Sequence, residues 1–74
     1  MPFIHISAYS GRDLETKKKA VQAIVKAASE AMGTPESAFT VAFEDIEKEK
    51  FAEVMQPTID KLSDKMIMRK GEML

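Results

Sequence analysis

The feature that most constrains the fold is one long amphipathic stretch between two short alternating ones. Residues 13–32 place apolar side chains three and four positions apart, which predicts a helix of about five turns. Asp13 is a suitable N-cap for it, and Gly33 a suitable C-terminal stop. Residues 2–9 and 38–46 instead alternate along the chain, as strands do. Strand, crossover helix and strand make a βαβ unit, whose two strands run parallel.

The last third of the sequence predicts more helix. Residues 47–68 carry a second apolar stripe, which includes Phe51. Pro57 interrupts this stripe, and proline both lacks a backbone donor and clashes with the preceding turn. We therefore expect one helix to end near Gln56 and another to begin with Pro57 as its first residue. The tail from Arg69 onward is expected to fray.

The expected fold class is α+β: a single βαβ unit followed by a C-terminal helical segment, in one domain over residues 1–74. A chain of 74 residues buries only roughly 60–65% of its unfolded surface. No cysteine is present to form a disulfide, and one histidine is too little for a zinc site, so no metal is expected. Both edges of a two-stranded sheet also expose unpaired backbone groups. We therefore expect two copies to pair edge to edge into a four-stranded sheet, as a homodimer.

The charge balance argues against several kinds of partner. Eleven Lys and Arg residues against twelve Asp and Glu give a formal net charge of −1, far from the basic footprint of a nucleic-acid-binding protein. The only basic cluster, Lys17–Lys19, is expected to be a solvated helix face. No apolar run approaches the ~20 residues that span a bilayer, and no export signal is evident. We expect a cytoplasmic protein with no nucleic-acid or membrane partner.

Few residues could carry chemistry, and two of them stand out. Removal of Met1 would expose the secondary amine of Pro2, which could act as a general base without any His or Cys. Such an amine must be kept neutral by burial and nearby cations. Arg12 lies at the start of the long helix, where a cation opposes the helix dipole. It could bind an anionic substrate, or it could pair with Asp13 or Glu15.

Three other polar residues are expected to be structural. His5 lies on the first predicted strand, where a packed or partly exposed histidine is a simpler interpretation than a catalytic one. Glu44 and Asp45 end the second predicted strand and are expected to form a polar turn. The sequence contains no glycine-rich phosphate loop, no nucleophile elbow and no metal-ligand spacing.

Taken together, these residues resemble a known family. Pro-Phe-Ile-His-Ile at residues 2–6, followed by Gly-Arg-x-x-Glu-x-Lys-Lys at residues 11–18, is similar to the 4-oxalocrotonate tautomerase family of small βαβ subunits. The ten-residue spacing from Pro2 to Arg12 matches that family, as do the Gly-x-Pro turn and the second strand. The similarity extends from residue 2 to about residue 51.

The resemblance implies a cofactor-independent tautomerase, an isomerase that acts on a small enol or 2-keto acid. Pro2 is then the implied general base, Arg12 the ligand of a substrate carboxylate or carbonyl oxygen, and Phe51 a wall of the apolar pocket. One subunit is too small to enclose such a site, so we expect self-association to assemble it.

The sequence also departs from the best-known members of the family. Their second substrate-binding arginine corresponds here to Thr40, which makes 4-oxalocrotonate itself an unsuitable substrate. Their Gly-rich C-terminal hairpin is expected to be absent and replaced by the helical segment 51–68, as in a branch of dimers with a helical C-terminus. A dimer is therefore expected rather than a hexamer.

Two alternatives stay open. The chain could be a non-enzymatic oligomeric or partner-binding module that keeps the fold. It could also be a hydratase or dehalogenase of the same family, in which Pro2 stays protonated and acts as a general acid.

Overall fold

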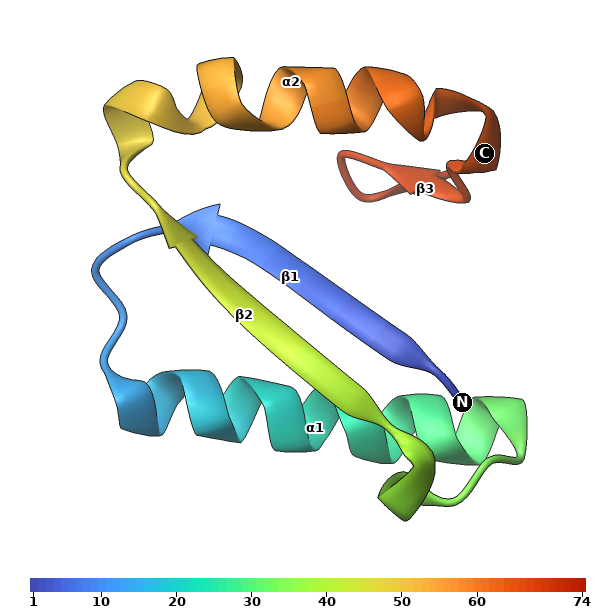
Figure 1. Ribbon diagram of the computed structural model, residues 1–74. Coiled ribbons are helices and arrows are strands. Elements are labelled where there is room, and N and C mark those ends of the chain that lie inside the picture. The colour runs from blue at the N-terminus through green and yellow to red at the C-terminus, as the bar shows by residue number, and fades with distance from the viewer.

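The computed structural model describes residues 1–74 and has an α+β architecture (Figure 1). Helix α1 covers one face of a two-stranded sheet, and helix α2 with a small hairpin lies on the other side. None of the helices is long and apolar enough to cross a membrane. The elements are β1 (Phe3–Tyr9), α1 (Leu14–Met32), β2 (Thr40–Ile46), α2 (Phe51–Lys61), β3 (Met68–Arg69) and β4 (Glu72–Met73), with short 3₁₀ turns at Glu36–Ala38, Lys48–Lys50 and Ser63–Lys65.

The predicted βαβ unit is confirmed. Strands β1 and β2 run parallel, in a register that sets Phe3 opposite Thr40 and Tyr9 opposite Ile46. The ladder extends past the start of β1, because the Thr40 N–H donates to the Pro2 carbonyl at 3.2 Å. Since the sheet has only two strands, each strand keeps one unpaired edge. Strand β1 thus separates Pro2, at its start, from the turn that leads into α1.

Helix α1 begins and ends where its capping residues predict. The Asp13 carboxylate accepts a hydrogen bond from the Thr16 N–H at 2.8 Å, which satisfies one of the donors that a helix start leaves free. Hydrogen bonds from the Thr16 side chain and from its N–H lower the pKa of Asp13, because they favour the charged carboxylate. At the other end, Gly33 adopts a left-handed conformation with φ of 67°, and its N–H donates to the Ser29 carbonyl.

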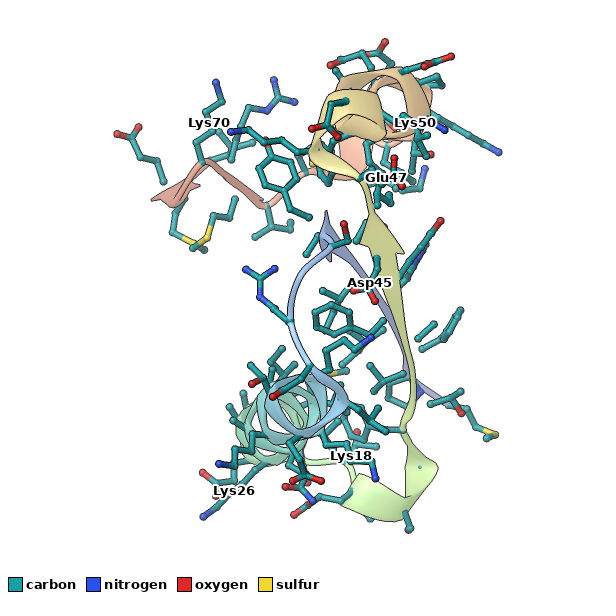
Figure 2. The ribbon with its side chains drawn as sticks, turned by 90° about the vertical axis from the view of Figure 1, so that its left-hand side faces the viewer. Lys18, Lys26, Asp45, Glu47, Lys50 and Lys70 are labelled. Atoms are coloured by element: carbon teal, nitrogen blue, oxygen red, sulfur yellow. The ribbon has the colours of Figure 1, made fainter.

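Helix α1 is fixed to β2 by one lysine of its basic cluster. Lys17 Nζ lies 2.7 Å from Asp45 Oδ2 and 5.9 Å from the centroid of the Phe43 ring. The expectation that all of Lys17–Lys19 faces solvent is therefore wrong for Lys17, which is half-buried, while Lys18 and Lys19 are exposed. Lys26, further along, points away from the sheet (Figure 2).

Helix α2 runs through Pro57, and the predicted break at Gln56 is wrong. A proline inside a helix has no N–H to donate to the carbonyl four residues earlier. Here that carbonyl belongs to Glu53. Glu53 is exposed, so water can hydrogen-bond to its carbonyl and the loss is small. The side chains of Gln56 and Asp60 also form a hydrogen bond of 2.8 Å across the proline.

The tail forms a hairpin, so the predictions of a frayed end and of a missing hairpin are both wrong. Strand β3 pairs antiparallel with β4, with Met68 opposite Met73 and Arg69 opposite Glu72. Lys70 and Gly71 connect them with φ values of 49° and 84°. Two consecutive residues with positive φ form the turn whose twist suits a two-residue hairpin. The hairpin removes one reason for preferring a dimer to a hexamer, and the number of copies stays a prediction.

The isolated chain leaves its apolar surface largely uncovered. Only Val25 and Ile46 are buried, at 9% and 6% exposure. The accessible surface is 6005 Å², whereas a folded monomer of this mass exposes about 4,600 Å². Twelve large hydrophobic residues are exposed: Met1, Phe3, Tyr9, Leu14, Ile24, Met32, Val54, Leu62, Ile67, Met68, Met73 and Leu74.

Candidate functional site

Pro2 lies immediately before β1, where the sheet holds its backbone. Its carbonyl accepts the hydrogen bond from Thr40 N–H, and its side chain is half-buried. Met1 before it is fully exposed. The position that corresponds to the family's second arginine, Thr40, is therefore beside Pro2 and carries no cation.

Arg12 and Phe51 both contact Tyr9, at the opposite end of β1. Arg12 Nη1 donates to the Tyr9 carbonyl oxygen at 2.9 Å. The rings of Tyr9 and Phe51 meet edge to face, with centroids 4.9 Å apart and planes at 89°. Such a pair is a favourable aromatic geometry. Tyr9, the last residue of β1, contacts Arg12 through its carbonyl oxygen and Phe51 through its ring.

A single chain does not bring the three predicted site residues together. Seven residue steps separate Pro2 from Tyr9 along β1, and a strand rises about 3.3 Å per residue, so the two lie roughly 23 Å apart. Arg12 and Phe51 share the end of β1 that carries Tyr9. The structure thus places two of the three residues at one end of β1, and a site that uses all three needs a second chain.

His5 joins the two strands on the sheet face away from α1. Its Nε2 lies 2.9 Å from Glu44 Oε1 and 3.3 Å from Ser7 Oγ. Both contacts use one ring nitrogen, whereas a catalytic triad needs the acid and the nucleophile on different nitrogens. This arrangement fits the structural role expected for His5. The predicted polar turn at Glu44 and Asp45 is wrong, because both residues lie within β2.

Two surface hollows are present, and neither contains Pro2, Arg12 or Phe51. One of about 290 Å³ lies between α1 and β2, and one of about 440 Å³ lies between α2 and the hairpin. No group of three or more His, Cys, Asp or Glu residues is arranged to hold a metal ion. The first hollow is lined by Leu14, Lys17, Lys18, Val21, Gln22 and Phe43, and the second by Gln56, Ile59, Met66, Met68, Arg69 and Lys70.

Tyr9 was not singled out from the sequence. Its contact with Phe51 depends on how the chain returns from β2 into α2, which alternation along β1 does not reveal. The available signal was its position at the end of a strand, three residues before Arg12.

Comparison with known families agrees with the motifs and the fold. A family model described as "Tautomerase enzyme" matches residues 2–54, more than two thirds of the chain. The chain therefore belongs to the tautomerase family, the family of 4-oxalocrotonate tautomerase. The matched region contains Pro2, Arg12 and Phe51 and ends within α2, so the hairpin lies outside it. No curated protein and no solved structure matches the chain.

Proposed function

We propose that this protein is a cofactor-independent tautomerase that converts a small enol acid into its 2-keto form, in the cytoplasm and as a homodimer. Removal of Met1 frees the Pro2 amine, which acts as the general base. Arg12 binds the substrate carboxylate, and Phe51 lines the pocket. The observation that carries the proposal is the position of Pro2 at one end of β1 and of Arg12 and Phe51, each in contact with Tyr9, at the other, in a chain of the tautomerase family.

The unpaired edge of β1 explains how two chains can complete the site. In an antiparallel pair the start of one strand lies beside the end of its partner. If the β1 strands of two copies pair in this way, Pro2 of each copy approaches Arg12 and Phe51 of the other. The product is a four-stranded sheet with two equivalent sites. Each chain exposes roughly 1,400 Å² more than a monomer of its mass should, an excess that an obligate dimer interface would cover.

The chemistry needs a neutral amine at Pro2. An ordinary α-amino group has a pKa of about 7.7–8.0, and the secondary amine of proline starts higher. A cation and an apolar wall both favour the neutral form, and Arg12 and Phe51 supply them. The amine takes the proton from the enol oxygen and becomes an ammonium. The electrons of the O–H bond form the carbonyl, and the electron pair of the C=C bond takes the proton back from Pro2 at carbon.

Arg12 stabilises the intermediate between these two proton transfers. The negative charge of the enolate spreads over oxygen and carbon, and a nearby cation lowers its energy. With Thr40 in place of a second arginine, the site has one cation for one carboxylate. We therefore assign the substrate to the monocarboxylic enol acids.

The proposal is tested with Pro2→Ala and a matched control. Intact mass first establishes that Met1 is absent, and ketonisation of phenylenolpyruvate is then followed by absorbance. We expect Pro2→Ala to lower kcat by about 10²- to 10⁴-fold, the usual contribution of a general base. Pro35→Ala, a change at an exposed proline between α1 and β2, should retain full activity. Full activity of Pro2→Ala, or of protein that keeps Met1, would falsify the proposal.

The hydratase or dehalogenase alternative predicts a different protonation state. In those reactions Pro2 would have to stay an ammonium at neutral pH and act as an acid. An NMR titration of the Pro2 nitrogen therefore separates the two chemistries: we expect the amine to be largely neutral at pH 7.5.

A further inference from the structure

We propose that Tyr9 is a third substrate-binding residue of this site and that its hydroxyl donates a hydrogen bond to the substrate oxygen on the carbon next to the carboxylate. The inference rests on the proposed function, since it takes Arg12 as the carboxylate ligand. It adds a group that neither the sequence motifs nor the family match assigns.

The position of Tyr9 is held from two sides. Tyr9 is the last residue of the β1 ladder, opposite the buried Ile46. Its carbonyl oxygen accepts a hydrogen bond from the Arg12 guanidinium. Its ring is held by the edge-to-face contact with Phe51. A side chain fixed in this way loses little further freedom when a ligand binds, so its polar group can contribute more to affinity.

The hydroxyl of Tyr9 is available to a ligand. The chain makes seven hydrogen bonds that involve side chains, and none of them uses this hydroxyl. Tyr9 is 48% exposed in the isolated chain. A tyrosine that packs its ring against an apolar neighbour usually presents its O–H to a polar partner. Here that partner would be whatever binds beside Arg12 and Phe51.

The substrate carries an oxygen that can accept this hydrogen bond. A 2-keto acid or its enol carries an oxygen on the carbon next to the carboxylate, and this oxygen becomes negative when the enol loses its proton. A donor aimed at the developing charge stabilises the enolate more than the neutral substrate. Arg12 is occupied by the carboxylate in this arrangement, so the 2-oxygen needs a second donor. The phenol O–H of Tyr9 stays intact and only donates a hydrogen bond.

Binding measurements with two ligands test this contact without relying on turnover. Phenylpyruvate carries the 2-oxygen, whereas 3-phenylpropanoate has the same ring, chain length and carboxylate without it. By isothermal titration calorimetry the wild type should bind phenylpyruvate about 3- to 10-fold more tightly, the usual effect of one neutral hydrogen bond. Tyr9→Phe, which keeps the ring, should bind the two ligands equally. The proposal is overturned if the wild type shows no preference, or if Tyr9→Phe keeps it.

Tyrosine fluorescence gives an independent readout in the wild type. The chain contains one tyrosine and no tryptophan, so the emission comes from Tyr9 alone. Phenylpyruvate should change this emission in proportion to the binding curve from calorimetry. An unchanged emission at saturation would place the ligand away from Tyr9 and overturn the proposal.

Kinetics separate this inference from the proposed function. Tyr9→Phe should lower kcat for phenylenolpyruvate by about tenfold, and KM should rise by no more than the about 3- to 10-fold loss of ground-state binding, because the oxygen gains its full charge only after binding. If Pro2→Ala is inactive and Tyr9→Phe matches the wild type in both kinetics and binding, only the role of Tyr9 is wrong. If Pro2→Ala is fully active, the general base is wrong, whatever Tyr9 does.

Discussion

The βαβ unit and the C-terminal arm, defined here as α2 with the β3–β4 hairpin, are stabilised in different ways. Both buried residues of the chain, Val25 and Ile46, belong to the βαβ unit. Residues 51–74, the arm with its connections, have none, and they carry half of the large exposed hydrophobic residues. It meets β1 where Phe51 packs on Tyr9, and then extends beside the sheet (Figure 1).

Under the proposed dimer, the βαβ unit specifies the subunit and the arm contributes to the assembly. The βαβ unit has its own register, helix caps and ion pair between helix and sheet. The hairpin has a defined turn, but the apolar side chains around it face outward. Exposed apolar clusters of this kind usually mark contact surfaces. We propose a second copy as the partner, since a site that uses Pro2, Arg12 and Phe51 together also needs one.

The largest effect is expected from placing charge on the arm. Met68 and Met73 face each other across the hairpin and are exposed by 52% and 68%. We expect the double variant Met68→Glu/Met73→Glu to dissociate into monomers, because two carboxylates would have to be buried in the interface. Activity with phenylenolpyruvate should then fall more than about 100-fold, since one chain cannot join Pro2 to Arg12.

Light scattering after size exclusion measures the mass, and Lys26→Glu is the matched control. It changes the net charge by the same two units, at an exposed position on the side of α1 away from the sheet (Figure 2). Lys26→Glu should keep the wild-type mass and activity. A dimeric and active double variant would mean that the arm is not part of the interface.

Loss of Arg12 should have the next largest effect, and it should act on the site alone. Arg12→Ala removes a charge-assisted hydrogen bond to the substrate, so kcat/KM should fall by about 10- to 100-fold. Arg12 is exposed and its one intramolecular bond goes to the Tyr9 carbonyl, so the oligomer and the thermal midpoint should change little.

Arg12→Lys should recover part of the activity, since a lysine keeps the charge but not the planar geometry. Lys26→Ala, which removes an exposed cation elsewhere on α1, should be fully active. An Arg12→Ala variant with wild-type kinetics would show that the carboxylate binds somewhere else.

The two regions also differ in how far the sequence predicts them. Long periodic segments with capping residues, such as the stretch from Asp13 to Gly33, identified α1 and the two strands because many positions report the same period. The hairpin has strands of two residues each, too short for any period, and only Lys70-Gly71 marks its turn.

The other errors concern tertiary surroundings. Whether Pro57 breaks a helix depends on whether the carbonyl of Glu53 can reach water, which the local sequence does not state. The local sequence does not indicate the role of Tyr9 for the same reason, because its partner Phe51 is far along the chain. The family resemblance implies Pro2, Arg12 and Phe51 as a set, and only the strand geometry shows that one chain holds Pro2 apart from the other two.

A smaller effect, confined to the βαβ unit, is expected at the start of α1. Asp13→Ala removes the hydrogen bond to Thr16 N–H and should lower the thermal midpoint by roughly 5 °C for a chain of this size. Asp13→Asn keeps a capping oxygen and should lose much less at pH 7. Circular dichroism at fixed protein concentration measures both, and equal midpoints for wild type and Asp13→Ala would contradict the role of the cap.

The cap also predicts a pH dependence. The pKa of Asp13 is lower in the folded chain than the usual 3.8, through the hydrogen bonds from Thr16. The unfolded chain therefore binds the proton more readily, and the stabilisation is present above about pH 4 and lost as the pH falls through the folded pKa. The midpoint difference between wild type and Asp13→Asn should thus shrink below pH 3.8. A difference that stays constant down to pH 2 would contradict this linkage.

The smallest effect is expected from the ion pair that joins α1 to β2. Asp45→Asn removes the partner of Lys17 Nζ at 2.7 Å, but leaves that lysine against the ring of Phe43. The side chains are 21% and 34% exposed, so solvent screens the pair, and the loss should be at most about 1 kcal/mol. The difference in stability between the wild type and Asp45→Asn should be smaller still in 1 M NaCl, where the Debye length is about 3 Å.

The exposed pair of Lys65 and Asp64 is the matched control for this prediction. Its atoms are 3.5 Å apart, and its side chains are 71% and 75% exposed. Asp64→Asn should not change the midpoint at either salt concentration, because a fully solvated pair contributes almost nothing. If Asp64→Asn destabilises the protein as much as Asp45→Asn, ion pairs contribute equally to the stability of the C-terminal arm and of the βαβ unit. If only Asp45→Asn does, the ion pair belongs to the internal packing of the βαβ unit, as its position over Phe43 implies.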